Sequence, residues 1–410
     1  MPRESRPVIV QKFGGTSVAT PAGRSALAAR VAATLADDRD VVVVVSAMGR
    51  LGSPYATDTL LALLEGPECD ARESDLLASC GEIVSAVVIA HELRGSGIPA
   101  MAFSGPDAGL MTDDRHGDAS VLLVDPSALQ SALAQGHVPV VAGFQGISSS
   151  GEVTTLGRGG SDTSACAIAA ALSAEVVEIY TDVDGVMTAD PRVCEAAQVL
   201  DALEYEELFQ MARHGARVMH APAAEAAMSA HVPVRIRNTF SEAAGTLIAD
   251  AERIADSRRA SVATAVSHVD GIARVTVRLP AEEDLAGAMA EMTRVFAAMA
   301  AAGVSLDMFT PFGASLVFSL AEPSLVDAMH GLDRIGLPYS VETGLAKVTL
   351  VGAGMHGVPG VMARVAAALS HADVDVLQVA DSHTTISVLV ASTHKRAAIA
   401  ALHQAFALDA

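Results

Sequence analysis

The C-terminal part of the chain contains an internal repeat, which restricts its possible folds more than any other feature of the sequence. Residues 273–277 read Ala-Arg-Val-Thr-Val, and residues 346–350 read Ala-Lys-Val-Thr-Leu. Two further pairs of segments correspond: residues 289–308 with 360–377, and residues 315–319 with 385–389. Each copy follows the pattern strand, helix, strand, strand, helix over roughly 70 residues, which is typical of a small α+β unit of the split βαβ kind. The sequence therefore predicts two such units in succession.

Before the repeat, up to about residue 250, apolar β-branched runs alternate with alanine-rich runs. The apolar runs predict buried strands, and the alanine-rich runs predict helices. The predicted strands are residues 8–11, 41–46, 138–142, 176–181 and 234–237. The predicted helices are residues 22–35, 75–93, 161–172 and 223–230. This alternation is typical of an α/β fold in which a mainly parallel sheet lies between layers of helices.

Chain length and composition agree with several packed domains. At roughly 100–200 residues per domain, the 410 residues correspond to two to four domains. Hydrophobic residues make up 51% and charged residues 18% of the chain, a balance that excludes a disordered protein. Residues 249–259 are charged and lack periodicity, which indicates a boundary. We expect a first domain over residues 1–250, a linker with the first repeat over 251–341, and the second repeat over 342–410.

The chain is strongly acidic, with 27 Lys and Arg against 48 Asp and Glu and a formal net charge of −21. Such a surface repels phosphate backbones, so we expect a small ligand and neither nucleic acid nor an anionic membrane as partner. Apolar runs such as residues 41–45 and 165–177 are shorter than the ~20 residues of a membrane span. Residues 1–7 are not followed by the apolar segment of a signal peptide, so we expect a cytoplasmic protein.

The cysteines and histidines form none of the familiar metal-binding patterns. The four cysteines contain no CxxC pair, and the 13 histidines include no HExxH motif. We therefore expect neither a disulfide framework nor a metal site built from protein ligands alone.

Three motifs carry chemistry, and the first is KFGGTS at residues 12–17, directly after the first predicted strand. Glycines allow backbone N–H groups to approach phosphate oxygens, and a lysine supplies positive charge to a phosphoryl group in transfer. The motif predicts a phosphate-binding turn at Lys12, Gly14 and Gly15. It lacks the GxxxxGK[ST] of a P-loop, and the chain has no HRD or DFG motif of a protein kinase. A glycine pair that serves only the turn is the alternative.

The second motif, GRGGSDTS at residues 157–164, leads into the predicted helix 161–172. Arginine, glycines, hydroxyls and a carboxylate at one helix start can bind an anion and orient neighbouring groups. Ser161 or Asp162 could instead be a simple N-cap. The combination with Arg158 and two adjacent glycines favours a binding site.

The third motif, YTDVDGVMTADPR at residues 180–192, leaves a predicted buried strand and enters a loop. Loops at the carboxyl ends of strands are where open α/β sheets bind ligands. An acidic surface turn is the alternative.

Together, and in this order, the three motifs resemble the signatures of the aspartokinase family. Four further segments look like the family's intervening ones: VVVVVSAMG (41–49), SCGEIVSAVV (79–88), VVAGFQG (140–146) and VPVRIRNTFSEAAGTLI (232–248). The repeated units resemble ACT domains, which bind amino acids and pair side by side. Residues 49–66 and 380–390 look most like the diaminopimelate-sensitive isoform of Gram-positive bacteria. The resemblance covers essentially the whole chain and implies an amino-acid-kinase fold followed by two α+β ACT domains of the βαββαβ kind.

The resemblance also implies an enzyme in which ATP phosphorylates the side-chain carboxylate of L-aspartate to give 4-phospho-L-aspartate. This reaction is the first step toward lysine, diaminopimelate, threonine and methionine. The carboxylate is already ionised at pH 7, with a reference pKa near ~3.9, so the nucleophile needs no general base. Catalysis must therefore come from alignment and charge neutralisation.

The family's site residues carry over to matching positions of this sequence. The resemblance implies that Lys12 steadies the γ-phosphoryl group, that Asp162 orients the lysine, and that Arg158 clamps the α-carboxylate of aspartate. The expected ATP contacts, with Mg²⁺ bridging the phosphates, are Lys12, Phe13, Gly14, Gly15, Ser46, Thr181, Asp182, Met187, Asp190 and Arg192. The expected aspartate contacts are Thr57, Glu82, Arg158, Gly159, Gly160 and Ser161, with Glu82 taking the ammonium group.

For the ACT pair, the resemblance implies feedback control by lysine, threonine or meso-diaminopimelate bound between units of two chains, and hence a homodimer. The expected effector contacts are Val304, Asp307, Met355, Val358 and Asp381. The loop that reads like DKPGEA in lysine-sensitive enzymes is PAEEDL at residues 280–285 here, so lysine sensitivity does not follow.

Three other functions compete with this one. A catalytically silent amino-acid sensor is disfavoured by the intact Lys12, Arg158 and Asp162, and a kinase with another acceptor is disfavoured by KFGGTS and the ACT pair. GAGMHG at residues 352–357, with Asp381 further on, also matches a dinucleotide fingerprint. Only about 60 residues follow it, too few for two mononucleotide-binding halves.

Overall fold

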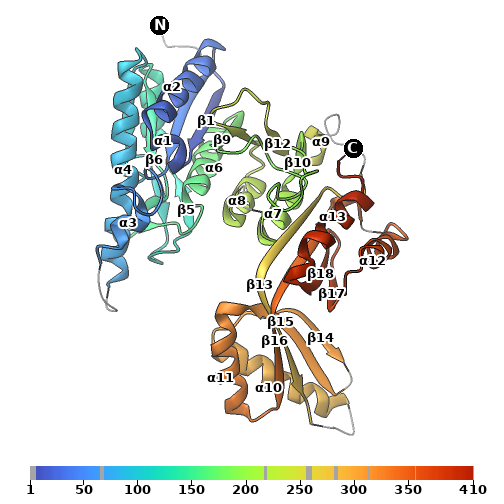
Figure 1. Cartoon of the computed structure of the whole chain (residues 1–410). Coiled ribbons are helices and arrows are strands. Elements are labelled where there is room, and N and C mark those ends of the chain that lie inside the picture. Colours follow the sequence, from blue (N-terminus) through green and yellow to red (C-terminus); the bar gives the residue numbers. More distant parts are fainter. Residues whose placement is uncertain are drawn as a thin grey trace. The chain divides into compact units, whose positions relative to one another are not determined.

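The computed structural model describes residues 6–64, 69–216, 219–254, 261–280, 285–312, 314–355 and 357–409. The chain forms two compact units (Figure 1). The first unit comprises Met1–Val186, Val199–Arg213 and Arg217–Ala260, and the second comprises Met187–Gln198, His214–Ala216 and Ser261–Ala410. The last part of the third motif, from Met187 onward, thus lies in the second unit.

The first unit is built on an eight-stranded sheet in the order β10-β12-β11-β9-β1-β2-β6-β3. Its strands pair in parallel except for β11 with β12, which pair antiparallel. The strands are β1 (Val8–Phe13), β2 (Asp40–Val45), β3 (Ala100–Phe103), β6 (Val138–Ala142), β9 (Val176–Thr181), β10 (Ala202–Glu204), β11 (Val234–Asn238) and β12 (Thr246–Ala249). All five predicted strands are confirmed, because continuous β-branched runs of this length fit strands buried on both faces.

Helices cover both faces of this sheet (Figure 1). On one face, Leu27 and Ile89 from two helices pack into one core with Val43 of β2, and α6 packs on the other side of β1 and β9. The helices of the unit are α1 (Gly15–Val18), α2 (Pro21–Ala36), α3 (Thr57–Leu61), α4 (Ala71–Gly95), α5 (Ser127–Ala134), α6 (Gly160–Leu172), α7 (Tyr205–Arg213), α8 (Ala221–Ser229) and α9 (Ala251–Ile254). The predicted α/β sandwich and its four predicted helices are confirmed.

A second, four-stranded sheet in the order β5-β4-β7-β8 was not predicted. Its strands are β4 (Leu110–Thr112), β5 (Val121–Val124), β7 (Gln145–Ser148) and β8 (Val153–Thr155). They have only three or four residues each, too few for periodicity to identify them. The sheet matters for function because β8 leads directly into the second motif.

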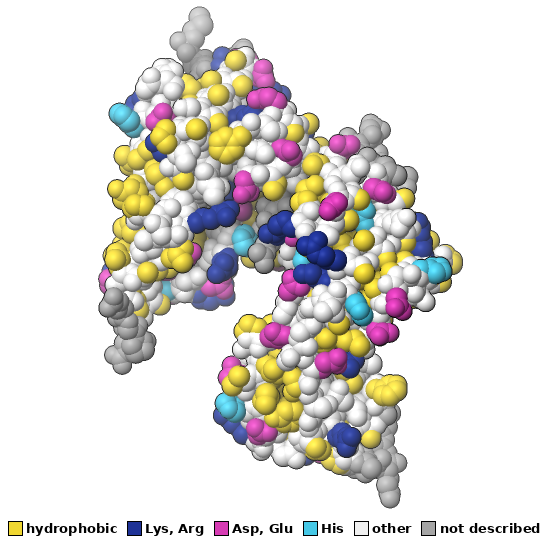
Figure 2. Space-filling model, viewed as in Figure 1, with side chains coloured by type: hydrophobic (Ala, Val, Ile, Leu, Met, Phe, Trp, Pro, Cys, Tyr) yellow, Lys and Arg dark blue, Asp and Glu magenta, His cyan; other side chains and the backbone are white. Residues whose placement is uncertain are grey.

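The helix α4 is long and apolar enough, by length and composition, to cross a membrane. Half of its most apolar window is buried inside the fold, with Ile89 and Leu93 in the core. Its outer face carries exposed Leu76, Ile83 and Val87, and hydrophobic side chains gather on this side of the unit in Figure 2. We interpret α4 as a core helix, because its inward face also carries polar side chains that find partners in the fold.

The second unit is one six-stranded sheet in the order β14-β15-β13-β16-β18-β17, with antiparallel pairing throughout. The strands are β13 (Ala265–Arg278), β14 (Asp307–Phe312), β15 (Ser315–Ala321), β16 (Tyr339–Val351), β17 (Gln378–Asp381) and β18 (Thr385–Ala391). The helices are α10 (Leu285–Ala301), α11 (Leu325–Ile335), α12 (Val361–His371) and α13 (Lys395–Ala405). The two predicted α+β copies are therefore confirmed, and the antiparallel sheet excludes the parallel dinucleotide-binding arrangement at residues 352–357.

The two copies share the long strands β13 and β16. Residues 272–277 of β13 pair with β15, and Ala273, Val275 and Val277 pack in the core of the first copy. Residues 265–270 pair instead with residues 346–351, and Val266 packs in the core of the second copy. The first strand of this region thus completes the second copy, although it precedes the first copy in the sequence.

Candidate active site at the carboxyl edge of the main sheet

The first motif forms a tight turn at the carboxyl end of β1. A side chain on Gly15 would place its Cβ 2.5 Å from the carbonyl oxygen of Ala47 and 2.8 Å from that of Gly49. Only glycine therefore allows the turn after β1 to touch the loop after β2. Beside it, Gly14 leaves open space, since its Cβ would meet nothing nearer than 3.8 Å, with Lys12 Nζ at 3.9 Å.

Lys12 and Asp162, which are 150 positions apart, form an ion pair. Lys12 Nζ lies 2.5 Å from Asp162 Oδ1, and the two side chains are only 11% and 8% exposed. Asp162 stands in the first turn of α6, whose N-cap is Gly159 with a left-handed φ of 78° and no side-chain cap. The simple N-cap alternative for Ser161 or Asp162 is therefore wrong.

The glycines of the second motif allow this helix start to pack closely. A Cβ on Gly160 would lie 2.8 Å from the Phe144 ring, and one on Gly159 would lie 2.4 Å from the His220 side chain. Between Gly157 and Gly159, both left-handed, Arg158 is exposed. It makes no hydrogen bond or ion pair with any residue that the structure describes. Its guanidinium is thus available to a ligand.

Glu82 is a buried carboxylate with one unsatisfied oxygen. The side chain projects from α4, and the residue is 3% exposed. Its Oε1 accepts the Ala47 N–H at 3.1 Å and the Thr57 hydroxyl at 3.3 Å. Its Oε2 is buried without a hydrogen-bond partner among the described residues. Burial raises the pKa of Glu82 from 4.5 to about 7. A cationic ligand would restore both the missing contact and the charged form.

The site residues predicted around these groups are distributed as follows. Ser46 follows β2, and its N–H donates to the Phe13 carbonyl at 3.2 Å. Ser161 is buried next to Gly143 at the end of β6. The Phe13 side chain is buried in the core and stacks on Tyr180 at 4.6 Å between ring centroids, so only its main chain faces the site.

The nucleotide residues predicted in the third motif do not all lie in the first unit. Thr181 ends β9, and Asp182 after it pairs with Arg50 at 3.3 Å. Asp190 and Arg192, in the second unit, pair with each other at 2.7 Å, and this hydrogen bond lowers the pKa of Asp190. Met187 also belongs to the second unit, whose core includes Ala189 and Cys194 from the same segment.

The predicted effector residues lie in the second unit in two settings. Val304 and Met355 are buried core side chains of the first and second copy. Asp307, at the start of β14, pairs with the buried Lys347, whereas Val358 and Asp381 are exposed. Residues 281–284, within the loop 280–285, and residue 356, next to Met355, lie outside the described residues.

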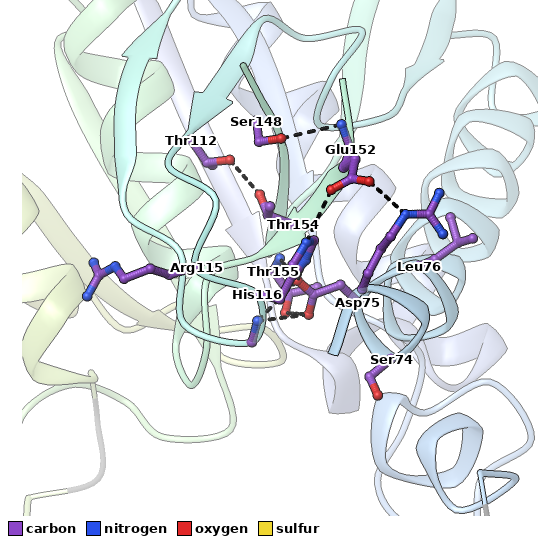
Figure 3. A network of polar contacts seen from close by, with 12 residues as sticks. Ser74, Asp75, Leu76, Thr112, Arg115, His116, Ser148, Glu152, Thr154 and Thr155 are labelled. Carbon is purple, nitrogen blue, oxygen red and sulfur yellow. Dashed lines mark hydrogen bonds and ion pairs between the residues drawn. The ribbon is translucent and has the colours of Figure 1, made fainter. Parts of the chain in front are cut away.

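Sequence reasoning missed a buried acid on α4, Asp75. It accepts hydrogen bonds from Thr155 and His116 (Figure 3) and from the Gly117 N–H. A detectable signal was present, because Asp75 and Glu82 are seven residues apart in an apolar helix and so share its inward face.

The chain is similar to two known protein families and to individual known proteins. Residues 7–238 match the amino acid kinase family, and residues 340–404 match an ACT domain. The chain is 44% identical to Aspartokinase 1 of Bacillus subtilis over 406 residues, covering 98% of this chain and 99% of the relative. It is 39% identical to the aspartokinase of Mycolicibacterium smegmatis, covering 98% and 96%.

Solved structures give the same result. E. coli aspartokinase III in complex with aspartate and ADP aligns with a TM-score of 0.77 and 26% identity, covering 97% of this chain and 99% of that chain. The same enzyme in complex with lysine and aspartate aligns with a TM-score of 0.77 and 25% identity, with the same coverage. The predicted resemblance and fold are confirmed, and the chain belongs to the aspartokinase family.

Proposed function

We propose that the site at the carboxyl edge of the main sheet transfers the γ-phosphoryl group of ATP to the side-chain carboxylate of L-aspartate. The observation that carries this proposal is the buried Lys12–Asp162 ion pair beside the glycine turn. A lysine held there neutralises charge on the phosphoryl group, and Asp162 keeps its ammonium group in place. The acceptor is already an anion, so positioning and charge neutralisation are sufficient.

The phosphates of ATP fit the turn that Gly15 keeps tight, at Gly14, where a Cβ would fill the open space next to Lys12. Mg²⁺ would supply further charge neutralisation when bound here. Carboxylate oxygens are ligands that Mg²⁺ accepts, and Asp162 is the acid at this point of the site. Ser46, Thr181 and Asp182 of the first unit complete the nucleotide contacts in this proposal.

Aspartate is held at its two charged ends. Arg158 binds the α-carboxylate, with Gly159, Gly160 and Ser161 beside it, because its guanidinium is exposed between two left-handed glycines. Glu82 binds the ammonium group through its unsatisfied Oε2, and Thr57 lies beside it through the same carboxylate. Opposite charges at two fixed points suit a zwitterion.

A direct test measures aspartyl hydroxamate formed from ATP, hydroxylamine and aspartate, with glutamate, N-acetylglutamate and uridylate as rival acceptors. We expect product with aspartate alone. Product with another acceptor only would favour the alternative kinases, and no ATP-dependent product at all would favour the silent sensor.

We further propose that the ACT pair forms a homodimer in the cytoplasm and binds an inhibitory amino acid through Val304, Asp307, Met355, Val358 and Asp381. The exposed Phe309 and Phe312 on the edge strand β14 support pairing with a second copy. The E. coli relative solved with lysine supports an amino-acid effector of this kind.

Inhibition assays with lysine, threonine and meso-diaminopimelate, alone and in pairs, identify the effector. We expect one of them, or a pair, to weaken apparent aspartate affinity by about 5- to 150-fold, the usual range of allosteric coupling. Asp381→Asn should reduce this inhibition and leave uninhibited turnover unchanged. Indifference of the wild type to every combination would contradict the proposed sensor.

A further inference from the structure

The buried carboxylate of Asp75 connects two segments near the candidate active site (Figure 3). Its Oδ1 accepts the Thr155 hydroxyl at 2.5 Å, and its Oδ2 accepts the Thr155 N–H at 3.0 Å. The Gly117 N–H donates to it at 3.0 Å, and His116 Nδ1 lies 2.9 Å from Oδ2. The residue is 2% exposed, so all of these contacts are made within the protein. None of them is used by the phosphoryl transfer.

The helix α4 relates this carboxylate to Glu82. The two residues are seven positions apart, which places them on one helix face and roughly 10 Å apart along the axis. Both are buried, at 2% and 3% exposure. A rigid helix therefore sets the distance from the Asp75 contacts to the Glu82 carboxylate.

The other side of the contacts leads to Arg158. Thr155 is the last residue of β8, and Arg158 stands three residues further on, before α6 begins at Gly160. Asp75 holds Thr155 by both its N–H and its hydroxyl, and the Thr155 carbonyl accepts the Ala119 N–H at 2.9 Å. These hydrogen bonds thus hold the start of the loop that carries Arg158 in place.

We propose that Asp75 and Thr155 are positioning residues that set the spacing between Arg158 and Glu82, and thereby the binding of aspartate. This inference rests on the roles proposed above for Arg158 and Glu82. A small displacement of β8 moves the groups that hold the two ends of aspartate out of register. Lys12 and Gly14 stand on β1 and the turn after it, which the Asp75 hydrogen bonds do not touch, so we expect the phosphate contacts to be less affected.

His116 makes this arrangement dependent on pH. Its Nδ1 faces Asp75, and its Nε2 lies 3.5 Å from Glu152 Oε2, while Arg72 contacts the other oxygen of Glu152 at 2.9 Å. With a carboxylate at each ring nitrogen, the imidazolium is favoured, and the hydrogen bond to Asp75 is the largest cause of the raised pKa of His116. Above that pKa the ring loses its charge, so we expect the KM for aspartate to rise at alkaline pH.

The test compares two threonine-to-valine variants that remove equally buried hydroxyls. Thr155→Val removes the bond to Asp75, whereas Thr112→Val removes a 2.5 Å bond to Thr154 in the same sheet. Both threonines are 2% exposed. We expect Thr155→Val to raise the KM for aspartate on the order of tenfold, as for other residues that orient ligand-binding groups, with the KM for ATP unchanged. Thr112→Val should change neither constant, and Thr155→Ser should restore the wild-type value.

Combination with Arg158→Lys separates this inference from the proposed function. If Thr155 acts through Arg158, its effect on the KM for aspartate shrinks in the Arg158→Lys background. Full additivity, or equal KM values for Thr155→Val and Thr112→Val, would overturn the positioning role. An unchanged KM in Arg158→Lys itself would overturn the proposed function instead. Should Thr155→Val fail to fold, His116→Asn, at the partly exposed end of the network, replaces it as the test variant. His116→Asn must raise the KM for aspartate and abolish the increase of this KM at alkaline pH.

Discussion

Replacing Lys12 with methionine is expected to lower the turnover number of aspartate phosphorylation by about 10²–10³-fold, the usual loss when one preorganised electrostatic group is removed. The same change leaves the buried Asp162 carboxylate without its partner. Breaking a buried pair in this way costs about 3–5 kcal/mol of the free energy of unfolding. Steady-state kinetics and urea unfolding measure the two effects separately.

The double variant Lys12→Met with Asp162→Asn is the matched control. It removes both charges and keeps the side-chain volumes similar, so we expect stability to return toward wild type while turnover stays low. Recovery of activity together with stability would contradict a chemical role for Lys12, since it would trace the whole loss to misfolding.

Replacing Glu82 with glutamine is expected to lower kcat/KM for aspartate by about 10- to 150-fold, because a hydrogen bond to a charged group is worth roughly 1.5–3 kcal/mol. Only the ionised carboxylate attracts the substrate ammonium, and burial raises the pKa of Glu82 to about 7. In the wild type, kcat/KM for aspartate should therefore fall tenfold per pH unit as the pH drops below about 7, since this constant reports groups of the free enzyme.

The Glu82→Gln variant has no titrating group at this position, so its kcat/KM profile should lose that acid limb. Glu92→Gln, on the same helix and partly exposed beside Arg24, is the control and should keep the wild-type profile. A retained acid limb in Glu82→Gln would assign the titration to another group and remove the support for ammonium binding by Glu82.

Much of the architecture could be predicted because the relevant signals are local. The runs that became β1, β2 and β9 are apolar and β-branched, and the alanine-rich runs became α2 and α6. Each hydrophobic pattern indicates which side chains of one short segment are buried, and it can be recognised from the residues of that segment alone. The strands of the four-stranded sheet were missed because each is too short to show a period.

The chemical character of the site could also be predicted, but not the contacts that its residues make. KFGGTS and GRGGSDTS indicated phosphate and anion binding from glycines, a lysine and an arginine. The sequence did not show that the Phe13 side chain is buried against Tyr180, that the segment from Met187 packs in the second unit, or that Asp75 anchors β8. All three depend on residues far away in the chain.

The sequence by itself determined the fold class, the repeat and the residue types of the site, because periodicity, glycine turns and charge are properties of neighbouring residues. Only the tertiary structure decided which other distant groups meet: Asp75 with Thr155, Phe13 with Tyr180, and residues 265–270 with the second copy. The physical reason is that the order of the strands and the packing of the helices set these distances. Both depend on the free energy of the whole chain and not on that of any one segment.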